Sequence, residues 1–199
     1  PRVATVLTDA ADRLYALKDI EQAQRVAERV LALDPPATAD QRRVATTVLA
    51  NTAFEGGAFD RAEKRYGELL TLTPANDKSR AELVERQAAS IYKQGEAAQK
   101  SGKAQDAVGH FTRVAAVAPG SAIHASAQYD AAAAMIGLKD WDNAAKTLED
   151  FRQRFPKHPL VDDASNKLAV AYLEKGRWSD AAGEFERAML LLHTKKENP

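Results

Sequence analysis

Only a few residues of this chain have the types and spacing that chemistry requires, and a phosphate-binding loop is the first to consider. The segment Lys100-Ser101-Gly102-Lys103 contains a Gly-Lys pair. A phosphate-binding loop also needs an earlier Gly at a fixed distance, and a Ser or Thr directly after the Lys. Ala104 follows the Lys instead, and the earlier Gly is missing. We therefore expect no nucleotide site and interpret the segment as a turn between two helices.

Histidine and acidic side chains could bind a metal ion or transfer protons. The pair Asp162-Asp163 stands where a helix is expected to begin, and acidic residues stabilise a helix start electrostatically. No His-Glu-x-x-His pattern is present, no two histidines are four residues apart, and no Ser lies in a nucleophile elbow. We therefore predict no catalytic residue, cofactor or metal site, and no enzyme activity. The histidines, expected on helix surfaces or in loops, are His110, His124, His158 and His193.

Composition excludes several further functions. The 199 residues include no Cys, which rules out cysteine zinc sites, iron–sulfur clusters, disulfides and thiol nucleophiles. The 28 basic residues balance 28 acidic ones, and Lys195-Lys196 is too short a basic run for nucleic acid, so we expect no nucleic-acid partner. No apolar run approaches the roughly 18 residues of a membrane span. Ala supplies about a fifth of the chain and aromatic residues only 7%, which favours helices over strands.

The start of the chain bears on its origin. Residue 1 is Pro, and no charged segment, apolar segment and cleavage site follow it as in a signal peptide. We interpret the sequence as a processed or excised piece of a longer chain, so its compartment is left open.

Small residues recur along the chain and show which elements must position any site. Five such anchors are spaced by 39, 45, 37 and 37 residues: Ala23, Ala62, Ala107, Ala144 and Ala181. An apolar residue lies three positions before each anchor: Ile20, Phe59, Ala104, Trp141 and Trp178. Four positions after the anchors are Ala27, Tyr66, Phe111, Leu148 and Phe185, and seven after are Val30, Leu69, Val114, Phe151 and Ala188. These offsets predict one buried face of a helix in each unit.

Each unit is expected to be two antiparallel helices. Apolar residues nine and thirteen positions before the anchor, such as Tyr172 and Leu168, repeat the pattern for a preceding helix. Gly57, Gly102 and Gly176 stand between the two helices, where a left-handed residue ends the first one, and Lys replaces Gly at 18 and 139. Pro follows twelve positions after four of the anchors, where it ends the second helix. Residues 76–83 are expected to lengthen the helix that ends near Ser101.

The pattern resembles the tetratricopeptide repeat (TPR) family, most clearly at Leu168, Tyr172, Ala181 and Phe185, with Ala169 in place of Gly. The resemblance implies an all-α, right-handed solenoid of about five helix pairs, forming one domain over residues 1–199. The expected repeats are residues 4–37, 43–76, 88–121, 125–158 and 162–195. The segment from Arg154 to Ala164 is similar to bacterial cell-envelope TPR proteins of the Tol-Pal-associated and outer-membrane-assembly types, which implies a periplasmic or cell-envelope location.

In TPR proteins the first helix of each unit lines a concave surface that binds partners. Offsets of fifteen, eleven and eight positions before the anchors select residues on that surface. The candidate partner-binding residues are Tyr15, Asn51, Phe54, Tyr92, Glu96, Tyr129 and Asn166. Tyr and Phe there would bury much area at low entropic cost, although Tyr92 and Tyr129 could instead pack on the neighbouring unit. The clamp for acidic C-terminal peptides needs a Lys at the fifteen-residue offset, and this chain has none.

The last predicted helix has an apolar face for which the sequence predicts no partner helix. The run from Ala188 to Leu192 is apolar, and a terminal repeat normally needs a polar outer face. Either the native chain continues there or the helix mediates self-association. The sequence therefore predicts a non-catalytic protein–protein interaction scaffold that binds a peptide or helix. The alternatives are a recruitment or regulatory domain of a larger enzyme or envelope-assembly protein and, less favoured, a hydrolase or transferase site in the groove.

Overall fold

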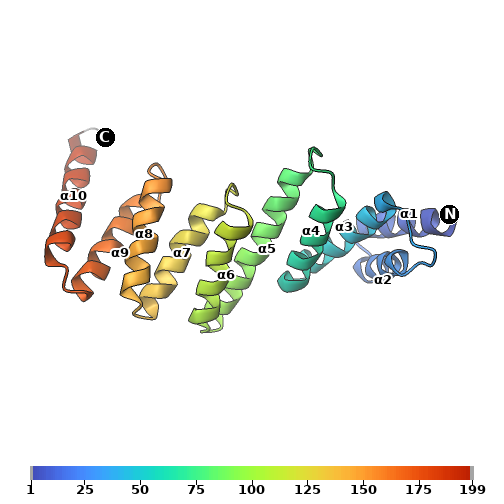
Figure 1. Ribbon diagram of the computed structural model, residues 1–199, viewed down its shortest axis with the longest axis horizontal. Coiled ribbons are helices and arrows are strands. Elements are labelled where there is room, and N and C mark those ends of the chain that lie inside the picture. The colour runs from blue at the N-terminus through green and yellow to red at the C-terminus, as the bar shows by residue number, and fades with distance from the viewer. Residues whose placement is uncertain (1, 198–199) are drawn as a thin grey trace. The chain divides into compact units, whose positions relative to one another are not determined.

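The computed structural model describes the backbone of residues 2–197 and the side chains of residues 2–189. Within this part the chain forms ten helices and no strand, and each odd-numbered helix turns back into the next one (Figure 1). The helices are α1 (Arg2–Ala16), α2 (Ile20–Leu31), α3 (Ala39–Glu55), α4 (Phe59–Leu72), α5 (Arg80–Lys100), α6 (Ala104–Val117), α7 (His124–Gly137), α8 (Trp141–Arg154), α9 (Val161–Glu174) and α10 (Trp178–Glu197). The predicted all-α hairpin architecture is confirmed.

The helices group into two compact units. Unit 1 spans residues 1–94 and unit 2 spans residues 95–199, so that α5 contributes its first part to one and its last part to the other. In unit 1, α3 packs against α1, α2 and α4. In unit 2, the helices from α6 to α10 follow one another in chain order, each packed on the next (Figure 1). That residues 1–199 form one continuous array remains a prediction.

The predicted anchors lie in the core because they let helices approach closely. Ala23, Ala62, Ala107 and Ala144 are fully buried, and Ala181 is 1% exposed. Small residues also recur twelve positions before the anchors, at Ala11, Ala50, Gly95, Ala132 and Ala169. A Cβ atom added to Gly95 would lie 2.5 Å from Cε1 of the buried Phe111, so α5 and α6 can meet there only around a glycine.

Left-handed residues end the first helix of every hairpin, as the sequence predicts. Gly57, Gly102 and Gly176 have φ angles of 76°, 74° and 68°. Lys18 and Lys139 take the same conformation at 64° and 60°, although a Cβ atom disfavours it. The backbone geometry of the turn is therefore imposed by the hairpin, even where the sequence does not supply glycine.

Helix starts and connections also follow from local chemistry. Thr38 and Gln41 form a capping box at the start of α3, and Asp162 and Asp163 lie in the first turn of α9 as expected. The lengthened helix is α5, which has 21 residues. Arg80 at its start donates to the carbonyl oxygens of Leu70 and Thr73, both at 2.7 Å, and so ties α5 to the end of α4.

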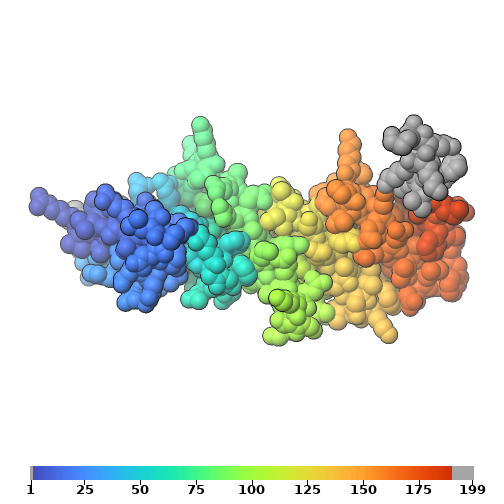
Figure 2. Space-filling model, turned by 180° about the vertical axis from the view of Figure 1, so that it is seen from behind, coloured from blue at the N-terminus to red at the C-terminus, as the bar shows by residue number. Residues whose placement is uncertain are grey.

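The outer face of α10 differs from that of the other second helices. Trp178 is 68% exposed and Phe185 43% exposed, so the expected burial of Trp178 is wrong. The corresponding Trp141 and Leu148 of α8 belong to a core cluster that includes Leu168 of α9. The reason is positional: α10, red in Figure 2, lies at the end of unit 2. Within the described residues, α9 packs against it and no further helix follows. The side chains of Leu190–Leu192, on which the apolar run depends, lie outside the described residues, as do those of His193, Lys195 and Lys196.

Candidate functional site

Unit 1 contains a groove on the side of its first helices, which we call the first-helix groove. Its volume is about 490 Å³, and the buried side chains of Tyr66, Leu69 and Thr73 from α4 line its floor. Its walls come from α1, α3, the segment before α5 and the first turns of α5. The lining residues are Asp12, Arg43, Val44, Thr47, Asn51, Tyr66, Leu69, Thr73, Asp77, Ser79, Glu82, Leu83 and Arg86.

A hydrogen-bond network brings two of the predicted binding residues, Tyr15 and Asn51, together beside this groove. The hydroxyl of Tyr66 donates to Oδ1 of Asn51 at 2.8 Å, and the hydroxyl of Tyr15 donates to Oε1 of Glu55 at 2.6 Å. Burial and the Glu55 carboxylate raise the pKa of Tyr15 to about 12, while a hydrogen bond with Asn51 acts in the opposite direction. The amide of Asn51 is therefore held in place by α4 and α1 rather than by its own helix alone.

The walls of the first-helix groove carry both signs of charge. Arg43 of α3 lies 3.5 Å from Asp77, and Arg86 of α5 lies 3.6 Å from Glu82. Hydrogen bonds from the backbone and hydroxyl of Ser79 lower the pKa of Asp77 below its usual value. The groove therefore offers paired charges together with amide and hydroxyl groups, which suit a polar backbone rather than one highly charged ligand.

The other predicted residues are spread more widely. The ring of Phe54 packs edge-on against Phe59 with centroids 5.4 Å apart, so it serves the α3–α4 hairpin. Tyr92 and Glu96 are half-buried on α5, on either side of the boundary between the two units. Asn166 is exposed on α9. Their role in partner binding stays a prediction.

Tyr129 lies on the first-helix side of unit 2. Its hydroxyl donates to Asp163 of α9, its ring centroid lies 6.0 Å from that of Phe151, and Lys167 Nζ lies 5.7 Å from the centre of its ring. Tyr129 therefore links α7 to α9, the packing alternative that the sequence left open for this residue. Binding and packing are compatible, because the side chain is only half-buried.

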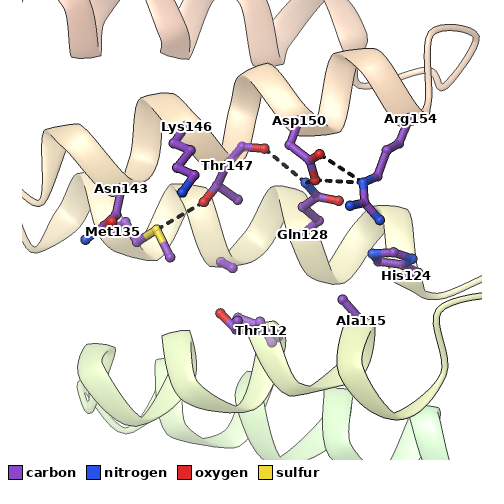
Figure 3. Close-up of a pocket in the computed structure, with 12 residues that line it drawn as sticks. Thr112, Ala115, His124, Gln128, Met135, Asn143, Lys146, Thr147, Asp150 and Arg154 are labelled. Atoms are coloured by element: carbon purple, nitrogen blue, oxygen red, sulfur yellow. Dashed lines mark hydrogen bonds and ion pairs between the residues drawn. The ribbon is translucent and has the colours of Figure 1, made fainter.

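A second groove, which the sequence did not predict, lies between α6 and α8 in unit 2, with α7 along its base (Figure 3). We call it the second-helix groove; its volume is about 470 Å³. It is lined by Phe111, Thr112, Ala115, His124, Gln128, Ala131, Met135, Asn143, Lys146, Thr147, Asp150 and Arg154. No motif marks it, because its residues come from three helices and have no common offset from the anchors.

Gln128 organises one end of the second-helix groove. Its Nε2 donates to Oδ2 of Asp150 at 2.7 Å and to the carbonyl oxygen of Thr147 at 3.1 Å (Figure 3). Burial acts to raise the pKa of Asp150, but hydrogen bonds from Arg154 and Gln128 outweigh it and lower that pKa. Among the described residues, no group donates to the buried Oε1 of Gln128. A bound group in this groove would need an N–H or O–H to satisfy that oxygen.

His124 corrects the expectation that every histidine lies at the surface. It is 3% exposed, its Nδ1 donates to the carbonyl oxygen of Pro119 at 2.9 Å, and its ring packs edge-on against Phe155. The residue therefore closes the α6–α7 connection against the core of unit 2. Within residues 2–189 no cluster of three or more His, Asp or Glu side chains could hold a metal ion.

The helices of the described chain include none that is both long and apolar enough to cross a bilayer.

Comparisons with known proteins agree with the hairpin architecture. Residues 84–177, just under half of the chain, match the model of the YfiO family, described as an outer membrane lipoprotein. A crystal structure of MamA protein is similar over 98% of this chain and 95% of its own, with 20% identity and a TM-score of 0.52. The structure of YrrB, titled a TPR protein with an unusual peptide-binding site, is 18% identical over 96% of this chain and 90% of its own, with a TM-score of 0.47.

No curated protein matches the chain at the sequence level. The recurrent offsets, the five hairpins and the likeness to MamA agree on one architecture. The chain is a TPR-type helical repeat protein whose residues 84–177 are similar to the YfiO outer membrane lipoprotein family.

Proposed function

We propose that this chain is a protein–protein interaction scaffold and that the first-helix groove of unit 1 binds an extended segment of a partner protein. The observation that carries the proposal is the groove itself, which combines a buried floor at Tyr66 and Leu69 with polar walls at Thr47 and Asn51. Its volume of about 490 Å³ lies within the range of ligand-binding clefts. Apolar contacts with the partly exposed Val44 and Leu83 supply affinity, and hydrogen-bonding walls select a peptide backbone.

The polar groups of the groove support binding rather than a chemical step. Asn51 is held by the hydroxyl of Tyr66, and Thr47 donates to the carbonyl oxygen of Arg43 at 2.9 Å. A side chain that is already positioned loses little entropy when a ligand binds. The charged residues of the walls lie in opposite pairs and are not arranged as a nucleophile with its base. We therefore assign the groove a recognition role without catalysis.

A peptide-selection experiment tests this assignment. A displayed library of random peptides is selected on the immobilised protein, and dissociation constants of the enriched peptides are measured by fluorescence anisotropy. Thr47→Arg, which fills the groove, should weaken binding at least tenfold. The matched control is Thr112→Arg, which changes an exposed Thr that lines the second-helix groove and should leave affinity unchanged. If no peptide is enriched, or if only Thr112→Arg weakens binding, the proposal is wrong.

The match of residues 84–177 to an outer membrane lipoprotein family favours one setting for this scaffold. We infer that the array serves as a recruitment module in envelope assembly. Fractionation of native cells with an antibody against residues 1–199 tests this: the parent protein should appear in the envelope fraction, and its recovery only in the cytoplasm would contradict the inference.

A further inference from the structure

We propose that the second-helix groove of unit 2 binds the indole side chain of a tryptophan in a partner protein, together with a carboxylate of that partner. This groove and the first-helix groove share no lining residue, so either can bind without the other. The residues that line it lie between Phe111 and Arg154, inside unit 2 and away from both ends of the chain.

The groove is open because α6 carries a small side chain where other second helices carry a long one. Eight positions after the anchor, α2, α4 and α8 have Leu31, Leu70 and Arg152, all half-buried. A side chain at this position can reach the following first helix, since the guanidinium of Arg152 donates to Oγ of Ser165 at 3.2 Å. In α6 the residue is Ala115, which lines the groove. The space that a longer side chain would fill is therefore available to a ligand.

The next pair of second helices shows how this chain closes the same place by itself. Arg152 of α8 donates to Oε1 of Glu184, three positions after the anchor of α10, at 3.0 Å. The residues at these two offsets in α6 and α8 are Ala115 and Thr147, which cannot form an ion pair and which both line the groove. The internal pair thus indicates a ligand group that is as long as an arginine side chain and ends in an N–H donor.

Gln128 also calls for a donor in the groove. The two acceptors of its Nε2 are the carbonyl oxygen of Thr147 and the carboxylate of Asp150, so the amide must turn its nitrogen toward them (Figure 3). The opposite atom, Oε1, is buried and receives no hydrogen bond among the described residues. Only an inserted N–H or O–H group can satisfy this oxygen, and the exposed Arg154, bound to the same carboxylate, has to turn aside to admit it.

The charges of the groove disfavour a cationic ligand. The carboxylate of Asp150 is already paired with Arg154, whose Nε lies 2.9 Å from it. Lys146 is exposed and lines the groove, and no ion pair ties it within the described part of the chain (Figure 3). A bound guanidinium would add a second uncompensated cation to the site. An anionic group beside Lys146 is favoured instead.

An indole meets these requirements together. The half-buried Ala115 and Met135 give the groove an apolar surface, and a methionine sulfur makes favourable contacts with aromatic rings. Tryptophan combines a large apolar area with one N–H donor and no acceptor. A leucine would fill the space but leave Oε1 of Gln128 unsatisfied. The groove volume of about 470 Å³ lies within the range of ligand-binding clefts.

N-acetyl-L-tryptophan, which carries an indole N–H and a carboxylate, is the probe for this site. Titrated into the isotope-labelled chain, it should shift the amide NMR resonances of Ala115, Gln128 and Lys146 and leave those of the first-helix groove in place. N-acetyl-1-methyl-L-tryptophan lacks the indole N–H and should bind at least about fivefold more weakly, because the Gln128 oxygen stays unsatisfied. N-acetyl-L-tryptophan amide lacks the carboxylate and should bind about threefold more weakly than the acid, a difference that Lys146→Gln should abolish.

Substitutions test whether the gap beside Ala115 is the site. Ala115→Leu gives α6 the residue that α2 and α4 have at this offset, and it should weaken binding of the acid probe at least about tenfold. The matched control is Ala116→Leu, the same change at the exposed neighbouring residue, which should leave the affinity unaltered. Thr112→Arg, at an exposed residue that lines the groove, should cause the same loss as Ala115→Leu. Far-UV circular dichroism checks that each variant is folded.

Other results would overturn the proposal. These are no shift at any probe concentration, equal affinity for the methylated probe, equal affinity of the unaltered chain for acid and amide, and unchanged affinity in Ala115→Leu or Thr112→Arg. Shifts confined to unit 1 would assign the indole to the first-helix groove and contradict this site. If the probe binds as expected but no peptide depends on Thr47, this site stands and the proposed peptide groove fails.

Discussion

The hydroxyl of Tyr129 on α7 donates a hydrogen bond to the carboxylate of Asp163 on α9, so a residue predicted to face a partner also joins two consecutive first helices. Tyr15 and Glu55 make the same kind of link between α1 and α3. In both cases a cation lies over the tyrosine ring, Lys167 in one and Lys18 in the other. These tyrosines set the spacing of the first helices and therefore the surface presented to a ligand.

The Tyr129 link should be visible in the titration of Asp163. The hydrogen bond from Tyr129 is the main cause that lowers the pKa of this carboxyl below its usual value. We expect Tyr129→Phe to raise the Asp163 pKa, measured by carboxyl NMR titration, while the pKa of Asp150 stays unchanged because its partners are Arg154 and Gln128. A carboxyl with a lowered pKa stabilises the fold above its unfolded-state pKa, and this contribution is lost as pH falls. Tyr129→Phe should therefore lose less stability on acidification than the unaltered chain; an unchanged Asp163 pKa would contradict the link.

The left-handed turn residues provide a test of backbone strain. Lys139 has a φ of 60°, and replacement by glycine should raise the free energy of unfolding by about 0.5 kcal/mol, because the relief of strain exceeds the entropic cost of glycine. Gly102 has a φ of 74° and nothing within 4 Å of an added Cβ, so Gly102→Ala should lower that free energy by about 1 kcal/mol through conformation alone. Urea denaturation measures both changes. Effects of the same sign would mean that these turns are not equivalent.

The fold could be predicted from the sequence because its determinants are local and repeated. Anchors such as Ala107, the turn glycines and the prolines mark each hairpin at fixed offsets, and the structure buries the anchors and places the turns accordingly. The burial of Trp178 could not be predicted in this way. Its offset is that of Trp141, but burial depends on a neighbouring helix that the offset does not reveal.

Less of the candidate site than of the fold could be predicted from the sequence. The offsets select Asn51, which lines the first-helix groove together with Thr47. They do not reveal that Tyr66 of the following helix holds Asn51, nor that the ring of Phe54 packs on Phe59. The second-helix groove was missed because the position of Gln128 opposite Asp150 depends on how α7 and α8 pack, which a list of spacings does not contain.

The two tryptophans should respond very differently to truncation. Trp141 is half-buried against the core cluster of unit 2, and Trp141→Ala should lower the free energy of unfolding by about 2 kcal/mol. Trp178 is 68% exposed, and Trp178→Ala should change it by less than about 0.5 kcal/mol. Both changes are measured by urea denaturation. Equal losses for the two variants would argue against the exposed position of Trp178.

An ion pair between Arg152 and Glu184 joins α8 to α10. Arg152 of α8 is 16% exposed, donates to Glu184 of α10, which is 8% exposed, and lies 3.2 Å from Oγ of Ser165. Removing one partner leaves a buried charge, so Arg152→Met should cost about 3 kcal/mol of unfolding free energy. The double variant Arg152→Met, Glu184→Leu should recover most of this loss, because it also removes the buried carboxylate, whose other cation, the exposed Arg187, lies 3.8 Å away. Lys175→Met, which removes an exposed pair with Asp142, should cost less than about 1 kcal/mol. If the double variant is as unstable as Arg152→Met alone, the cost comes from lost packing and hydrogen bonds at α9 rather than from the stranded charge.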